Sequence, residues 1–88
     1  MKYLITLEPL DTGFGVEVPD LAISTFGATI EAAMHSASEA IRINLDAYRE
    51  EGMPVPPREP VARHLENPDN VGLLFAYVDV ADSADKAA

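Results

Sequence analysis

The amino-acid sequence predicts an α+β fold with a single domain over residues 1–80. Apolar and polar residues alternate through much of residues 2–27, apolar residues recur at three- and four-residue steps through residues 30–50, and residues 71–80 are apolar at nearly every position. Alternation is typical of strands, and the longer steps are typical of an amphipathic helix. We therefore expect a three-stranded antiparallel meander, one long helix on one face and a fourth strand that completes the sheet.

The first 27 residues predict the meander. Along residues 2–10, Tyr3, Ile5 and Leu7 alternate with residues that point to the opposite face. A turn at residues 11–13 ends in a glycine, which tolerates positive φ, and the following strand ends at Pro19, which has no N–H to donate. A short third strand is expected at residues 23–27.

The long amphipathic run predicts one helix that covers the sheet. Thr29 is a suitable N-cap, and Gly52 is a suitable stop. Four prolines between residues 54 and 60 then predict an extended connector, because each ring fixes φ and disfavours helix in the residue before it. A short helix is expected over residues 60–66.

The apolar run VGLLFAYVDV, residues 71–80, predicts the fourth strand and a contact between subunits. It carries more apolar side chain than one small sheet face can bury, and unpaired strand edges invite pairing. We expect a homodimer or larger assembly whose interface includes Leu73, Phe75 and Tyr77. Residues 81–88 are expected to be a disordered tail, and we expect no DNA-binding motif after Val80.

The composition argues against several classes of protein. Fifteen acidic and six basic residues give a net charge of -9, and the basic residues form no cluster that would bind nucleic acid. The chain has no cysteine, which excludes disulfides, zinc knuckles and thiol catalysis. We see no signal peptide and no apolar run of membrane length, so we expect a soluble, cytoplasmic protein. The acidity fits a basic protein partner, although it also serves solubility alone.

No residue pattern indicates a catalytic, cofactor or metal site. Glu31, His35 and Glu39 follow one another at four-residue steps along the predicted helix, but a solvated face explains this row better than a metal site does. His64 lies in a segment expected to be exposed, where a surface histidine is a better interpretation than a general base. No serine has the flanking glycines of a hydrolase nucleophile.

Four carboxylates lie close together in the sequence, at Glu8, Asp11, Glu17 and Asp20. A metal-dependent nuclease would need at least two of them to meet. Because they fall on alternating strands, their side chains need not converge. A nuclease is therefore our third functional hypothesis.

The order of short motifs resembles the N-terminal domain of HicB-family antitoxins. The chain has Tyr3 in the first strand, the acidic-glycine turn DTG at residues 11–13, the block FGVEVPDL at residues 14–21, GAT before the helix at residues 27–29, and EGMPVP at residues 51–56. The family's Pro-Gly-Cys after the Pro-Asp-Leu block is replaced here by Ala22, Ile23 and Ser24. The resemblance covers about residues 2–57.

The resemblance implies a degenerate ribonuclease-H-like arrangement and a partner. HicB proteins generally bind and silence HicA toxins, which are small basic mRNA-cleaving proteins. Our leading hypothesis is therefore a non-enzymatic antitoxin-like module that neutralises a HicA-type mRNA interferase. The alternative is an orphan oligomeric HicB-like protein that binds neither toxin nor operator.

The segment around the glycine turn is the expected partner surface. It combines an acidic turn at Asp11, an aromatic at Phe14 and a second acidic corner at Asp20 and Leu21. We expect the carboxylates to face lysine and arginine side chains of the toxin. The competing interpretation is that Phe14 and Leu21 are core residues and that the acids are merely solvated.

Overall fold

The computed structural model describes residues 1–80, so the predicted disordered tail at residues 81–88 lies outside the described residues. The elements follow in the order β1 (Lys2–Leu10), β2 (Gly13–Val18), η1 (Pro19–Leu21), β3 (Ile23–Gly27), α1 (Ile30–Glu50), α2 (Val61–Glu66), η2 (Pro68–Asn70) and β4 (Leu74–Asp79). The strands form one antiparallel sheet in the order β3-β2-β1-β4. This arrangement confirms the predicted α+β fold.

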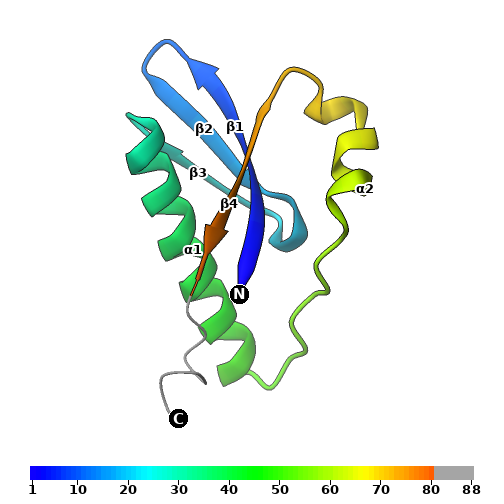
Figure 1. Ribbon diagram of the computed structural model, residues 1–88. Coiled ribbons are helices and arrows are strands. Elements are labelled where there is room, and N and C mark those ends of the chain that lie inside the picture. The colour runs from blue at the N-terminus through cyan, green and yellow to red at the C-terminus, as the bar shows by residue number, and fades with distance from the viewer. Residues whose placement is uncertain (81–88) are drawn as a thin grey trace.

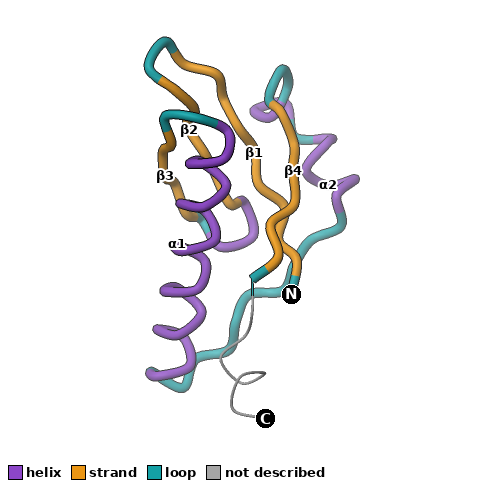
Figure 2. Tube along the Cα trace, turned by 60° about the vertical axis from the view of Figure 1, so that its left-hand side comes forward, coloured by secondary structure: helices purple, strands orange, loops and turns teal. Residues whose placement is uncertain are grey.

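The two helices lie on opposite sides of the sheet. Figure 1 shows α1 along one side and the short helix α2 on the other. In Figure 2 the connector leaves the end of α1, passes beneath the sheet and leads up to α2. No helix within residues 1–80 is long and apolar enough to span a membrane.

The core fills the space between α1 and the sheet. Alternation along the strands directs one set of side chains toward the helix. The helix packs against them with a stripe of apolar residues at three- and four-residue steps. The buried core cluster consists of Tyr3, Ile5, Leu7, Val16, Val18, Leu21, Ala33, Ala37, Ile41, Leu45, Val78 and Val80. The predicted core face of the first strand is confirmed.

The start of α1 is fixed by a cap and by a close approach to β3. Thr29 Oγ1 accepts a hydrogen bond from the Ala32 N–H at 3.0 Å, as predicted for an N-cap. Gly27 lies so close to the first turn that a Cβ built on it would be 2.2 Å from the Ala33 nitrogen. Only glycine leaves room for the helix to pack on β3 here.

The fourth strand is shorter than the sequence predicted. Residues 71–73 were expected to be extended in the sheet, but Val71 is 78 % exposed and β4 begins at Leu74. The prediction was wrong here because Gly72 adopts φ +84 and the Leu73 N–H donates to Asn70 O, which makes a turn. β4 pairs with β1 and is an edge strand.

The segment after α1 is held against the sheet by side-chain contacts, and we call residues 53–70 the strap. Arg58 Nη1 donates to Lys2 O at 2.9 Å, and its guanidinium carbon lies 5.7 Å from the centroid of the Tyr3 ring. Further along, Asn70 Nδ2 donates to His64 O at 2.9 Å. Leu4 is only 4 % exposed although it faces away from α1, and it lies next to the Arg58–Val61 part of the strap.

Candidate partner-binding surface

The register of the sheet assembles a row of polar side chains on the face away from α1. Thr6 lies opposite Phe75 on β4 and opposite Glu17 on β2, and Glu17 in turn lies opposite Ser24 on β3. Directly opposed residues point to the same face of a sheet. The next row places Glu8 opposite Gly15. The strap covers part of this face near Leu4, which leaves the end toward the β1–β2 hairpin open.

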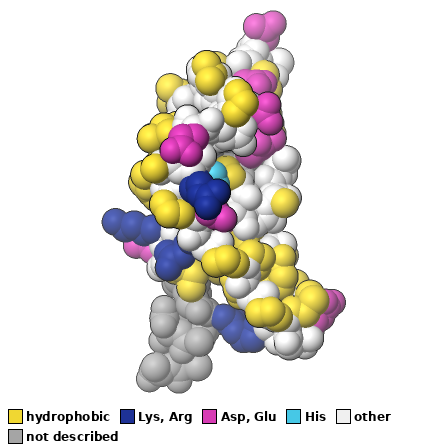
Figure 3. Space-filling view, turned by 90° about the vertical axis from the view of Figure 1, so that its right-hand side faces the viewer, with side chains coloured by type: hydrophobic (Ala, Val, Ile, Leu, Met, Phe, Trp, Pro, Cys, Tyr) yellow, Lys and Arg dark blue, Asp and Glu magenta, His cyan; other side chains and the backbone are white. Residues whose placement is uncertain are grey.

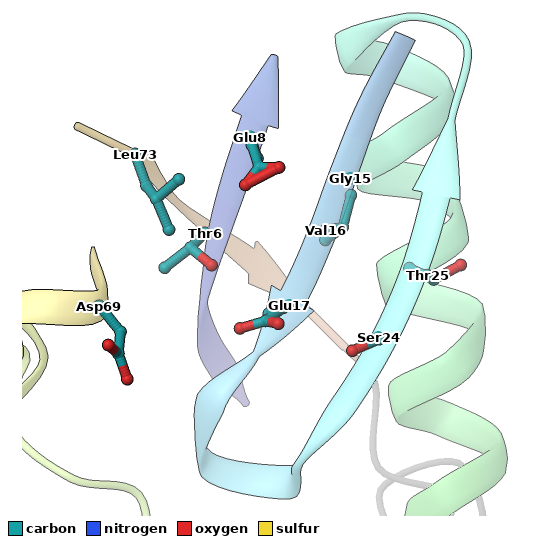
Figure 4. Close-up of a pocket in the computed structure, with 9 residues that line it drawn as sticks. All are labelled: Thr6, Glu8, Gly15, Val16, Glu17, Ser24, Thr25, Asp69 and Leu73. Atoms are coloured by element: carbon teal, nitrogen blue, oxygen red, sulfur yellow. The ribbon is translucent and has the colours of Figure 1, made fainter. Parts of the chain in front are cut away.

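A hollow of about 430 Å³ lies at this open end, and we call it the acidic groove. Figure 4 shows its lining, with Thr6, Glu8, Glu17 and Ser24 on the sheet and with Asp69 and Leu73 on the segment across from it. Gly15 contributes to the hollow because it places no side chain between the flanking residues. The groove therefore has a floor of strands and a wall made by η2 and the turn after it.

The groove is acidic and carries no compensating cation. Three carboxylates line it, from Glu8, Glu17 and Asp69, and no lysine or arginine is among its lining residues within the described part of the chain. Figure 3 views the side that carries α2 and shows acidic side chains gathered toward the end of the molecule that bears the hairpin tip. Such a concentration of one sign of charge attracts cationic partners and raises their association rate.

The acids do not form a metal site within residues 1–80. No group of three histidine, cysteine or acidic side chains is arranged to hold a metal ion there. Of the four carboxylates that the nuclease hypothesis considered, two share the groove, Asp11 lies at the exposed hairpin tip, and Asp20 is engaged elsewhere. The geometry offers acceptors for hydrogen bonds rather than a set of ligands for a divalent ion.

The structure separates the four predicted partner residues. Asp11 is exposed in the hairpin turn, and Phe14 is partly buried against the core. Leu21 is only 6 % exposed and belongs to the core, as the competing interpretation held. Asp20 has a side chain that is 2 % exposed, so it is not an open acidic corner of this chain. A role in partner binding remains a prediction for all four.

Asp20 instead joins η1 to the strap. Its Oδ1 accepts a hydrogen bond from the Glu59 N–H at 3.0 Å and lies 3.0 Å from His64 Nε2. The His64 side chain is 11 % exposed, so the sequence-based expectation of a surface histidine was wrong. The cause is that α2 packs its histidine inward over η1 rather than toward solvent. No sequence signal links two residues 44 positions apart.

Two of the three residues predicted for a subunit interface share one face of β4, and Leu73 lies just before the strand. Phe75 and Tyr77 point away from α1, opposite Thr6 and Leu4 of β1. Tyr77 is 53 % exposed, and Leu73 borders the acidic groove. Because β4 is an edge strand, its outer backbone groups and this apolar face are available together. The interface itself remains a prediction.

The row of Glu31, His35 and Glu39 lies on the outer surface of α1, and Glu39 in this row is paired with an arginine. Glu31 and His35 are exposed, and Glu39 Oε2 accepts a 2.8 Å hydrogen bond from Arg42 Nη2 one turn further on. The same helix carries a second pair of this kind between Asp46 and Arg49. These are solvated ion pairs along a surface helix, as expected for such a face.

The position of some groove residues could be predicted from the sequence. Strand alternation alone places Glu8 and Glu17 on the face away from the core, so their common side could be predicted once the hairpin register was assumed. Asp69 and the depth of the groove could not be predicted, because they depend on how the strap returns to the sheet. From the sequence alone, Glu8 and Glu17 were candidates only for metal chemistry.

The fold and the groove define an α+β domain with an acidic, open binding face, and the comparisons with known proteins place it in a family. The family described as HicB_like antitoxin of bacterial toxin-antitoxin systems matches residues 3–87. The chain therefore belongs to the HicB-like antitoxin family, which confirms the resemblance read from the sequence. A comparison with curated protein sequences gave no match.

Solved structures of antitoxins share the fold. The antitoxin HicB of Burkholderia pseudomallei is 29 % identical with a TM-score of 0.82, over 91 % of this chain and 63 % of that one. Its N-terminal domain is 28 % identical with a TM-score of 0.82, over 92 % of this chain and 99 % of that one. A chain in a structure of the HicA3 and HicB3 toxin-antitoxin complex is 26 % identical with a TM-score of 0.75. The match covers 92 % of this chain and 99 % of that one.

The match to the longer relative is partial. This chain spans 63 % of the length of the B. pseudomallei HicB chain, and it corresponds to nearly all of that protein's N-terminal domain. The similarity therefore covers an N-terminal domain. For this chain, the family match over residues 3–87 shows membership of the antitoxin family.

Proposed function

We propose that this chain is a non-enzymatic binding module that neutralises a small basic toxin of the HicA type. The observation that carries the proposal is the acidic groove, an open hollow lined by three carboxylates on a domain of an antitoxin family. The similar chain in the HicA3 and HicB3 complex supports a toxin as the kind of partner.

Charge makes the pairing physically reasonable. The chain carries a net charge of -9, and a toxin that cleaves mRNA needs a basic surface to hold phosphates. An acidic protein that covers this surface competes with RNA for the same lysine and arginine side chains. Neutralisation then follows from occlusion and needs no chemistry in the antitoxin.

Growth rescue tests the proposal in cells. A HicA-type toxin is expressed from an inducible promoter, with and without this chain. We expect the toxin alone to stop growth and the pair to restore it. Failure of this chain to restore growth, when it is present in soluble excess over the toxin, would contradict the proposal.

The enzyme alternative is tested with the chain alone. We expect the purified protein to leave RNA intact in the presence of Mg²⁺, because its groove acids form no metal-type cluster within the described residues. Cleavage that disappears in Glu17→Gln would replace the binding proposal with a nuclease. Cytoplasmic location and assembly into a homodimer or larger form remain proposals alongside this one, as does the absence of direct DNA binding by this chain.

A further inference from the structure

The floor of the acidic groove holds a threonine hydroxyl. Thr6 is only 1 % exposed, and its side chain lines the groove. Figure 4 shows this hydroxyl directed into the groove, toward the strand that carries Glu17. A hydroxyl that opens onto the groove is placed to contact whatever enters it, as a donor or as an acceptor.

The charged groups of the groove are all acceptors. The carboxylates of Glu8, Glu17 and Asp69 accept hydrogen bonds and donate none when ionised. A cation with several donors therefore fits the carboxylates, and the hydroxyls of Thr6, Ser24 and Thr25 can donate or accept beside it. The guanidinium group of arginine has five N–H donors, no acceptor and a planar shape that pairs with carboxylates in a bidentate manner.

We infer that the acidic groove is a receptor for an arginine side chain of the protein partner, with Thr6 at its floor and Glu8, Glu17 and Asp69 around its mouth. This inference rests on the proposed function for the identity of the partner and names the contact that would hold it. Arginine is favoured over lysine because the carboxylates lie both on the floor, at Glu8 and Glu17, and on the wall, at Asp69, which a planar fork can bridge.

Gly15 gives a direct way to close the groove without disturbing the fold. Its φ is not in the positive range, and a Cβ built on it meets its nearest atom, Leu10 Cδ1, at an ordinary 3.6 Å. Valine is favoured in strands and adds side-chain bulk on this face between Glu8 and Phe26. Gly15→Val is therefore the blocking variant, and Glu17→Gln is the variant that removes one charge while keeping the shape.

The first experiment uses N-acetyl-arginine amide as a probe and follows the backbone amide resonances of the ¹⁵N-labelled protein. We expect shifts that saturate at millimolar concentrations and concentrate at Thr6, Glu8, Glu17 and Ser24. The neutral isostere N-acetyl-citrulline amide should not produce them, and both variants should abolish them. Glu31→Gln on the outer side of α1 is the matched control, and it should respond like the wild type.

Three results of this titration would overturn the inference. The first is a set of shifts spread evenly over all acidic surfaces, and the second is a set of shifts that persists unchanged in Gly15→Val. The third is that Mg²⁺ shifts the same amide resonances at a lower concentration than the arginine probe does. The last result would assign the groove to a divalent cation instead.

The second experiment separates this inference from the proposed function. With a HicA-type toxin, we expect Gly15→Val and Glu17→Gln each to weaken binding by about tenfold or more, since desolvated charge pairs carry large coupling, while Glu31→Gln has no effect. If the toxin binds the wild type and both variants equally, the inference is wrong and the proposed function stands. If no such toxin binds the wild type, the proposed function fails, and the arginine titration alone decides the inference.

Discussion

Asp20 Oδ1 lies 3.0 Å from His64 Nε2, and this contact joins η1 to the short helix α2 across 44 residues of sequence. The Asp20 side chain is 2 % exposed and that of His64 is 11 % exposed, so the contact is shielded from solvent. The same carboxylate oxygen accepts the Glu59 N–H. The strap is therefore held to the sheet by a polar contact rather than by apolar packing alone.

Removal of this carboxylate should destabilise the whole domain. In Asp20→Ala the Glu59 N–H and the His64 ring lose their partner, and a buried group left unsatisfied costs about 1–3 kcal/mol. We expect the free energy of unfolding in urea to fall by about 2 kcal/mol. A double-mutant cycle with His64→Ala should give a coupling energy of about 1 kcal/mol.

The control for this prediction is an aspartate in an exposed pair. Asp46 and Arg49 form a solvated contact on α1, so Asp46→Ala should change stability by no more than about 0.5 kcal/mol. Equal effects of Asp20→Ala and Asp46→Ala would show that the contact does not hold the strap.

Gly27 should not tolerate replacement by alanine. Because a Cβ there would meet backbone atoms of Ala33, Gly27→Ala must displace α1 from β3. We expect a loss of about 3 kcal/mol in the free energy of unfolding, in line with overpacking of a tight contact. Gly15→Ala is the matched control, since its Cβ has room, and thermal unfolding should show it neutral or slightly stabilised. Similar melting temperatures for the two variants would refute this account of helix packing.

The sequence predicted the layers of this fold better than it predicted its working face. Alternation along residues 2–27 and the helical stripe depend on local spacing, which is why the strands, the helix and its Thr29 cap were predicted correctly. The path of the strap depends on contacts between distant residues, such as Asp20 with His64. For that reason an acid expected at a surface corner is inside, and the groove wall at Asp69 was not predicted.

The exposed face of β4 should mediate self-association. Phe75 and Tyr77 lie on this face beside the unpaired edge of the sheet, and apolar side chains beside an open strand edge favour pairing. We expect light scattering at micromolar concentration to give the mass of a dimer or larger for the wild type and a smaller mass for Tyr77→Lys.

Ile43 offers the control for this prediction. It is 64 % exposed on α1, away from the sheet edge, so Ile43→Lys should leave the mass unchanged. A wild type that is monomeric at this concentration, or a Tyr77→Lys variant with unchanged mass, would remove β4 as the interface.

Asp11 should affect how fast a basic partner arrives. Its carboxylate lies exposed at the hairpin tip near the acidic groove, and rim charges act mainly on the encounter rate. We expect Asp11→Lys to slow association with a HicA-type toxin by about threefold at low salt and to flatten the salt dependence of the rate. Stopped-flow fluorescence measures both.

Two variants make the Asp11 test specific. Glu50→Lys changes the same charge at the end of α1, which lies at the opposite end of the molecule from the hairpin tip in Figure 1, and it should slow association less. Reversal at Asp20 is not a suitable variant, because it would place an ammonium group at a buried position. An Asp11→Lys variant with the wild-type rate and salt slope would exclude the hairpin tip from the encounter surface.

The central claim is that this domain binds and silences a basic toxin through its acidic face. The most direct measurement is a calorimetric titration of the purified chain with a HicA-type toxin, followed by an RNA cleavage assay on the same mixture. We expect saturable binding that weakens as salt is raised, and cleavage that is lost in proportion to the complex formed. Absence of binding at low salt, or a complex that cleaves RNA as fast as the free toxin, would contradict the account.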